Sequence, residues 1–281
     1  MNRKGFDGKA IYNPSGKAGE YSEWACNFFN GCSNDCDYCY CKRGFMSRNW
    51  SDKPTLKKCF RDDADALNVF ERELTANLAD LRKSSLFFTF TSDPFLTDPA
   101  VNAIYLTAML IALKNGVPIQ ALTKRHEFAY QPICTNALGM YQDKVAIGFT
   151  LTGHDELEAH ASTNKLRIDA MCRLHKLGFK TFASIEPVVD FESSLAMIQA
   201  TVGCCDLYKV GLMSGGGKQY DRLDCISFVD HVHTLLWMDE NNAKIYWKEC
   251  VRKLVDNDLI TNTGYPMAVG ADYDIFGRAK V

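Results

Sequence analysis

Three cysteines near the N-terminus have the spacing of ligands to one metal cluster. Cys32, Cys36 and Cys39 form a C-x3-C-x2-C array, and the aromatic residue Tyr38 stands directly before the third cysteine. A cube of four irons needs four external ligands, so a chain that supplies three thiolates leaves one iron open. An open iron can bind and activate a second cofactor or a substrate. The spacing therefore predicts a 4Fe-4S cluster that does chemistry.

The composition limits the alternatives for these cysteines. The chain has 281 residues, 12 of them cysteine, and 47% of its residues are hydrophobic. Disulfide frameworks are typical of short secreted chains, whereas this chain is long and its first ten residues have no apolar stretch. We therefore expect reduced thiols in a cytoplasmic protein without a membrane-spanning segment. A structural zinc site with Cys41 as the fourth ligand is the alternative, although no second C-x2-C pair follows.

The charge balance argues against a strong general affinity for nucleic acid. Lys and Arg together number 32 against 34 Asp and Glu, so no global basic field is present. Any contact with nucleic acid would be local. A basic and aromatic surface is predicted around the cysteines, and an ordinary solvated loop is the equal alternative; its residues are Lys42, Arg43, Phe45, Arg48, Trp50, Lys57 and Lys58.

One short apolar segment precedes the cysteines, and further apolar segments alternate with helical patterns after them. Six strands are predicted, at residues 24–29, 85–90, 117–122, 145–151, 179–185 and 207–212. Strands that alternate with helices pair in parallel through right-handed crossovers. Six units are too few to close an eight-stranded barrel. We therefore predict an α/β fold, a partial (β/α)6 TIM-like barrel that is open on one side, with the cluster loop after the first strand.

No linker, low-complexity run or charge block divides the chain, so a single domain is predicted over residues 1–281. Its core is expected at about residues 22–248, with an N-terminal extension at 1–21 and a C-terminal segment at 249–281. Helices are predicted at residues 63–83, 99–115, 164–177, from about 192, and at 223–238.

Polar side chains stand where several predicted strands end. Ser92 and Asp93 follow the second strand, Lys124 follows the third, and Glu186 follows the fifth. The carboxyl ends of parallel strands meet at one edge of the sheet, where barrel enzymes place their chemistry. We therefore expect these side chains to lie close to the cluster loop.

The run Cys32-Ser33-Asn34-Asp35-Cys36-Asp37-Tyr38-Cys39-Tyr40 resembles the signature of radical S-adenosylmethionine (SAM) enzymes. The runs Ile11–Tyr21 and Asn27–Cys32, followed by Thr91–Pro94, Leu122–Lys124 and Glu186-Pro187, further resemble the branch of that superfamily that contains spore photoproduct lyase. The resemblance implies that SAM binds the open iron and is cleaved reductively to a 5'-deoxyadenosyl radical, which abstracts hydrogen from a substrate. The substrate is left open between nucleic acid, peptide and small molecule. A low-potential electron donor such as flavodoxin or ferredoxin is implied as a partner.

The resemblance also implies roles for individual residues around SAM. Ser92 and Asp93 would contact its ammonium group, and Lys124 would contact its carboxylate. Thr150 would lie near the ribose. The backbone at Tyr38 would contact the adenine.

Further positions carry weaker expectations. Glu186 would line the cavity or begin a helix, and Val210 with Gly211 would let the adenine approach closely, because glycine has no side chain. Spore photoproduct lyases use a cysteine as hydrogen donor. The end of the second strand holds no thiol here, so Cys204 and Cys205 are the candidate donors, with a packing role as the alternative. A different class of function stays open, a non-catalytic zinc- or iron-sulfur-binding module that recognises nucleic acid.

Overall fold

Eight strands form the main sheet of the computed structural model, which describes residues 5–213, 219–256, 260 and 266–278. Their spatial order is β1-β2-β5-β6-β7-β8-β9-β10. All pairs from β2 to β10 are parallel, and β1 pairs antiparallel with β2. The bounds are β1 (Ile11–Tyr12), β2 (Ala25–Cys26), β5 (Leu86–Phe88), β6 (Ile119–Thr123), β7 (Val145–Thr150), β8 (Lys180–Val188), β9 (Leu207–Leu212) and β10 (Lys244–Trp247). The sheet does not close into a barrel, which confirms the predicted open α/β fold.

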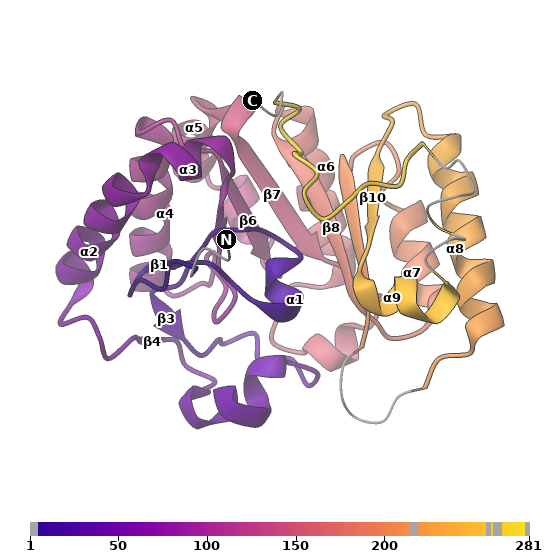
Figure 1. The fold of residues 1–281 in the computed structure, drawn as a ribbon, viewed down its shortest axis with the longest axis horizontal. Coiled ribbons are helices and arrows are strands. Elements are labelled where there is room, and N and C mark those ends of the chain that lie inside the picture. The colour runs from indigo at the N-terminus through magenta and orange to yellow at the C-terminus, as the bar shows by residue number, and fades with distance from the viewer. Residues whose placement is uncertain (1–4, 214–218, 257–259, 261–265, 279–281) are drawn as a thin grey trace.

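Helices follow most of the strands (Figure 1). They are α1 (Gly16–Gly19), α2 (Asp63–Ala76), α3 (Leu78–Lys83), α4 (Pro99–Lys114), α5 (Pro132–Gly139), α6 (Asn164–Lys176), α7 (Phe191–Gln199), α8 (Arg222–Trp237) and α9 (Glu249–Val255). Of these, α2, α4, α6, α7 and α8 lie around the outer face of the sheet, whereas α1 lies on its inner side (Figure 1). Short 3-10 helices are η1 (Tyr40–Lys42), η2 (Gly44–Asn49), η3 (Glu127–Tyr130), η4 (Gln142–Lys144) and η5 (Asp155–Glu158).

The ends of these helices follow from the sequence. The side chain of Asp62 accepts a hydrogen bond from the Asp65 N–H at the start of α2. Gly116 and Gly178 have φ of 77° and 89° just beyond α4 and α6, a conformation that favours glycine. The helix predicted over 63–83 is divided at Asn77, whose φ of −117° is not helical.

The first predicted strand, 24–29, is also divided. β2 belongs to the main sheet, whereas β3 (Phe29–Asn30) pairs antiparallel with β4 (Thr55–Leu56) in a separate two-stranded sheet. Between β2 and β3, the Asn27 side chain accepts a hydrogen bond of 2.9 Å from the Phe90 N–H. This side-chain contact replaces a ladder bond, so the strand ends there. The cysteine loop consequently follows β3.

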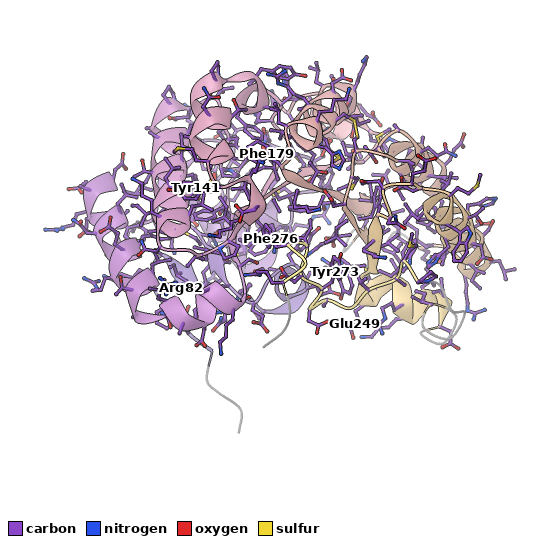
Figure 2. The ribbon with its side chains drawn as sticks, turned by 90° about the horizontal axis from the view of Figure 1, so that it is seen from above. Arg82, Tyr141, Phe179, Glu249, Tyr273 and Phe276 are labelled. Carbon is purple, nitrogen blue, oxygen red and sulfur yellow. A yellow bond between two sulfur atoms is a disulfide. The ribbon has the colours of Figure 1, made fainter. Side chains whose placement is uncertain are left out.

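Both chain ends pack against the sheet. The Glu73 carboxylate accepts hydrogen bonds from the backbone N–H groups of Lys9, Ala10 and Ile11 at 2.7–2.9 Å. Near the C-terminus, Ile275 belongs to a second apolar cluster on the inner face of the sheet, together with Tyr21, Phe87, Ala146, Phe182 and Leu207. Figure 2 shows Tyr273 and Phe276 of this segment lying over the middle of the sheet. Among the helices of the described residues, none combines the length and apolar character needed to span a bilayer.

Candidate active site

A cavity of about 430 Å³ lies where the strands of the main sheet end. The cysteine loop forms one wall, with Cys32, Cys36, Cys39 and Cys41 all lining the space. The ends of β5, β6, β7 and β8 form the floor, and α1 closes the side near β10. The predicted arrangement, a cysteine loop that faces the carboxyl ends of the strands, is therefore present.

Backbone contacts hold the cysteine loop in place. The Cys32 N–H donates to the Ser51 carbonyl at 3.0 Å, and the Asp37 N–H donates to the Leu157 carbonyl at 3.0 Å. Gly31 has φ of 85°, and a Cβ atom there would lie 2.6 Å from the Ser51 carbonyl oxygen, so only glycine fits. The loop geometry thus depends on a glycine directly before the first cysteine.

The cysteines differ in their surroundings. Burial raises the pKa of the Cys32 and Cys36 thiols, whereas a hydrogen bond from Cys41 lowers the pKa of Cys39 to about 6. Across the described ranges, no three His, Cys, Asp or Glu side chains converge on a position for one metal ion.

Asp93 is buried at the cavity floor, and protein groups donate hydrogen bonds to both oxygens of its carboxylate. Its carboxylate accepts hydrogen bonds from the Asn34 side chain at 2.8 Å and from the Thr123 hydroxyl at 2.7 Å. The backbone N–H groups of Phe95 and Lys124 donate to it at 2.9 and 2.8 Å. A carboxylate has about four acceptor positions, so these four donors saturate it. Asp93 ties the cysteine loop to the ends of β5 and β6.

Neighbouring polar groups on the same floor are unsatisfied. The Ser92 hydroxyl and the Asn34 amide oxygen are buried and have no hydrogen-bond partner among the described residues. Lys124 lines the cavity, and its ammonium forms no ion pair within that part of the chain; it stands 5.5 Å from the centre of the Tyr38 ring. Buried polar atoms in native proteins are almost always paired. Two acceptors and one cation are thus left for a ligand.

The cavity has a second polar end, of which the sequence analysis predicted Glu186 but not Lys248. Glu186, predicted at the cavity, accepts hydrogen bonds from Lys248 at 2.7 Å and from the Tyr21 hydroxyl at 2.9 Å. The Tyr21 hydroxyl also lies 2.6 Å from the Ser184 hydroxyl. Lys248 follows β10, a strand that was not predicted. The available signal was the apolar run Ile245-Tyr246-Trp247, followed by a polar residue, as at the other strand ends.

Comparison with solved structures identifies the fold. The complex of spore photoproduct lyase with dinucleoside spore photoproduct superposes with a TM-score of 0.61 at 12% sequence identity, over 84% of this chain and 79% of that chain. A mutant of the same enzyme with bound AdoMet and dinucleoside spore photoproduct gives 0.59 at 12% identity, over 80% and 76%. This chain has the spore photoproduct lyase-like radical SAM fold.

Streptococcus suis SuiB bound to S-adenosylmethionine has the same radical SAM fold, with a TM-score of 0.54 at 13% identity over 81% of this chain. The chain covers 52% of SuiB, so it spans about half of that protein's length. No protein-family model matches the chain, and a search of curated protein sequences finds no match.

Tyr38 and Thr150, for which contacts with SAM are expected, both line the cavity. The Tyr38 hydroxyl donates to Glu158, and the Thr150 carbonyl accepts from Arg167 at 2.6 Å. Neither Glu158 nor Arg167 was singled out in the sequence, because a Glu and an Arg nine residues apart have no special spacing.

Val210 and Gly211 are not among the residues that line the cavity, so the close approach of the adenine expected there stays a prediction. Val210 is fully buried in the hydrophobic core and does not line the cavity. A Cβ atom on Gly211 would lie 2.9 Å from the side chains of Glu186 and Lys248, so the glycine makes room for that ion pair. The absence of a side chain serves protein packing there.

The candidate hydrogen donors lie at the wrong end of the sheet. Cys204 and Cys205 precede β9, whereas the cavity is at the strand ends, and neither cysteine lines it. Cys204 forms a disulfide with Cys172, contrary to the expectation of reduced thiols, and the Cys205 thiol is buried against the Leu207 carbonyl at 3.3 Å. Neither cysteine is placed to donate hydrogen to a molecule in the cavity, and among the four cysteines that line the cavity, Cys41 is the one outside the predicted cluster set.

The predicted basic surface is partly neutralised. Lys42 forms an ion pair of 2.6 Å with Asp35 and stands 5.6 Å from the Trp50 ring centre. The Lys57 ammonium donates to the Lys9 carbonyl at 2.6 Å. The Phe45 side chain lies outside the part that the structure describes. Trp50 does line the cavity, so one aromatic member of the surface reaches the site.

Proposed function

We propose that this protein is a radical SAM enzyme that binds a 4Fe-4S cluster through Cys32, Cys36 and Cys39. The observation that carries the proposal is one cavity that holds these three thiols together with Ser92, whose hydroxyl has no hydrogen-bond partner, and Lys124, which forms no ion pair among the described residues. In solved structures of the same fold, spore photoproduct lyase binds AdoMet and SuiB binds S-adenosylmethionine. The fold and the donor set therefore agree.

The polar groups at the cavity floor match the charges of SAM. The Ser92 hydroxyl and the Asn34 amide oxygen would accept hydrogen bonds from its ammonium group, and Lys124 would pair with its carboxylate. Asp93 would act through them, since it holds Asn34 and the Lys124 backbone. This assignment refines the expectation that Asp93 itself meets the ammonium.

The cluster, when bound, supplies the electron that cleaves SAM and gives methionine and a 5'-deoxyadenosyl radical. The protein must hold SAM in one pose and keep water away from the reacting carbon. Phe90, Leu122 and Trp50 on the cavity wall provide apolar surface for that purpose. Thr150 is proposed near the ribose and the Tyr38 backbone near the adenine.

Reduction requires a low-potential donor, for which we propose a flavodoxin or ferredoxin. The substrate is proposed among nucleic acid, peptide and small molecule. Trp50 at the cavity wall and the exposed Arg43 and Arg48 on the adjoining loop favour a substrate that carries a planar group and negative charge.

The test is metal content after anaerobic purification. We expect a brown protein with about four irons and about four sulfides per chain. Changing Cys32, Cys36 and Cys39 together to Ala should remove both, while Cys59→Ala, which alters an exposed cysteine away from the cavity, should retain them. A colourless protein that contains zinc would refute the proposal and favour the non-catalytic nucleic-acid module.

A further inference from the structure

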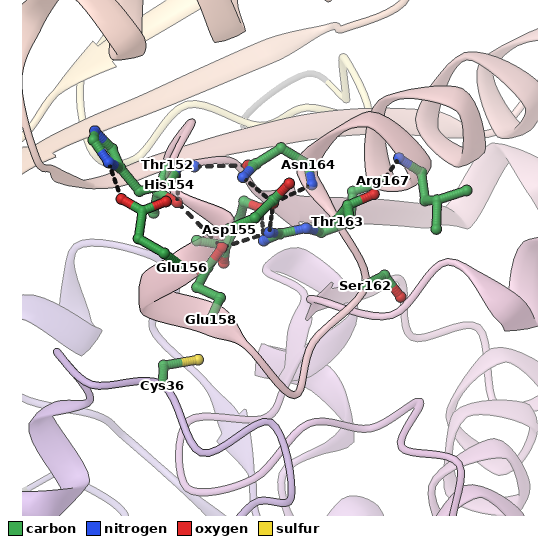
Figure 3. A network of polar contacts seen from close by, with 12 residues as sticks. Cys36, Thr152, His154, Asp155, Glu156, Glu158, Ser162, Thr163, Asn164 and Arg167 are labelled. Carbon is green, nitrogen blue, oxygen red and sulfur yellow. Dashed lines mark hydrogen bonds and ion pairs between the residues drawn. The ribbon is translucent and has the colours of Figure 1, made fainter.

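A buried ion pair lies behind the cysteine loop. The carboxylate of Glu158 and the guanidinium of Arg167 are in contact, and both side chains are fully buried. The Thr152 hydroxyl also donates to Glu158 at 3.1 Å, and Asp155 lies 3.7 Å from Arg167. Figure 3 shows this network, with Cys36 on the loop that faces it. Neither Glu158 nor Arg167 lines the cavity, so neither can touch a ligand there directly.

The pair nevertheless reaches three residues that do line the cavity. Glu158 accepts a hydrogen bond from the Tyr38 hydroxyl, and Arg167 donates to the Thr150 carbonyl at 2.6 Å. The Tyr38 ring in turn lies beneath the Lys124 ammonium, 5.5 Å from its centre. These three residues come from the cysteine loop, the end of β7 and the end of β6.

The charge on Glu158 strengthens its hold on Tyr38. Burial alone would raise the pKa of this carboxyl, but the charges of Arg167 and Lys124 and the hydrogen bonds from Arg167 and Tyr38 lower it below its ordinary value. Glu158 therefore stays ionised in the folded protein. Hydrogen bonds to an ionised acceptor are shorter and about twice as strong as neutral ones.

We propose that Glu158 and Tyr38 are positioning residues for SAM: Glu158 fixes the phenol of Tyr38, and the ring face of Tyr38 fixes the ammonium of Lys124 where the SAM carboxylate binds. This inference rests on the proposed function. It gives the Tyr38 side chain a role separate from the backbone contact expected from the sequence. A cation over an aromatic face is attracted to it, which restricts a flexible lysine without neutralising it.

The alternative is that the network only stabilises the fold. Removing the Tyr38 hydroxyl would then lower stability without changing how SAM binds. A positioning role predicts a loss of SAM affinity in a protein that still takes up its cluster, whatever stability the lost hydrogen bond to Glu158 costs.

The experiment compares Tyr38→Phe with wild type after anaerobic reconstitution. We expect unchanged iron content, an SAM dissociation constant raised about tenfold, which corresponds to one charge-assisted hydrogen bond, and an altered electron paramagnetic resonance spectrum of the reduced cluster with SAM. The control is Tyr208→Phe, because the Tyr208 hydroxyl is also buried and hydrogen-bonded, to Thr201 at 3.0 Å, but lies outside the cavity. It should bind SAM as wild type does.

A second variant, Tyr38→Leu, removes both the hydroxyl and the ring face, and it should weaken SAM binding further than Tyr38→Phe. Glu158→Gln should resemble Tyr38→Phe; should it fail to fold because Arg167 loses its counter-charge, the Tyr38 variants decide. Wild-type affinity and spectrum in Tyr38→Phe would overturn the inference. A wild-type protein that takes up no cluster or binds no SAM would instead overturn the proposed function.

Discussion

At the scale of single residues, the cavity contains polar groups of two kinds: some are hydrogen-bonded to the protein itself, and others have no protein partner and can bind a ligand. Asp93 and Ser92 are adjacent in sequence, yet four protein donors saturate Asp93 and none reaches the Ser92 hydroxyl. The sequence could predict that both residues follow a strand. It could not show which of their side-chain oxygens the protein itself would hydrogen-bond, because the donors to Asp93 come from residues up to 59 positions away.

This difference predicts opposite effects of two substitutions. Asp93→Ala would leave several buried donors unpaired, so we expect the free energy of unfolding to fall by about 3 kcal/mol or more. Ser92→Ala removes a hydroxyl that the protein does not use, so stability should change by less than about 0.5 kcal/mol while SAM binding weakens. Chemical denaturation and SAM titration of both variants measure the two effects. Equal loss of stability in the two would contradict this division.

Lys124 is the cation that we assign to the SAM carboxylate. Lys124→Ala should weaken SAM binding by about 2–5 kcal/mol without loss of the cluster, because the carboxylate would be buried without a counter-charge. The matched control is Lys165→Ala, which removes an exposed lysine paired only with Asp169 on the surface of α6. SAM affinity equal to that of the control would remove Lys124 from the site.

At the scale of elements, the six predicted strands could be read from the sequence, whereas two further strands of the main sheet, β1 and β10, could not. Each predicted segment contains a strand, although the first is divided between β2 and β3, because parallel strands buried on both faces have clear apolar runs between helices. β1 is only two residues long. β10 was missed because its four residues follow α8 closely and lie near the end of the pattern. β10 matters for the site, since it positions Lys248 against Glu186 and pairs with β9 so that Tyr246 is opposite Lys209.

Lys209 on β9 makes stability depend on pH. Burial, together with the charge of Lys248, lowers the pKa of Lys209 to about 7, whereas an unfolded chain holds that proton up to about 10.4. Between these values the unfolded state binds more protons, so this lysine makes the free energy of unfolding rise as the pH rises from about 7 to about 10. Denaturation at several pH values, for wild type and Lys209→Met, isolates this contribution. We expect the rise to be smaller in the variant; identical pH profiles would contradict the buried, proton-releasing lysine.

At the scale of the whole molecule, segments far apart in the sequence meet at the cavity. The segment predicted as an N-terminal extension supplies Tyr21 and Lys17 to the cavity wall, and the Lys17 carbonyl accepts a hydrogen bond from Lys248 at 3.0 Å. These two residues are 231 positions apart, so no local pattern could reveal their contact. The sequence could predict that the three cysteines share one loop and that the α/β fold is open, because each depends on spacing or on local periodicity. The second polar end of the cavity depends on long-range packing instead.

The central claim is that three cysteines hold a cluster whose open iron activates SAM beside Lys124. Its most direct test is to incubate the anaerobically reconstituted, reduced protein with SAM and to quantify 5'-deoxyadenosine. We predict slow release of this nucleoside without added substrate, and none from the protein in which Cys32, Cys36 and Cys39 are changed to Ala. Absence of 5'-deoxyadenosine from a wild-type protein with a full, reduced cluster would contradict the claim.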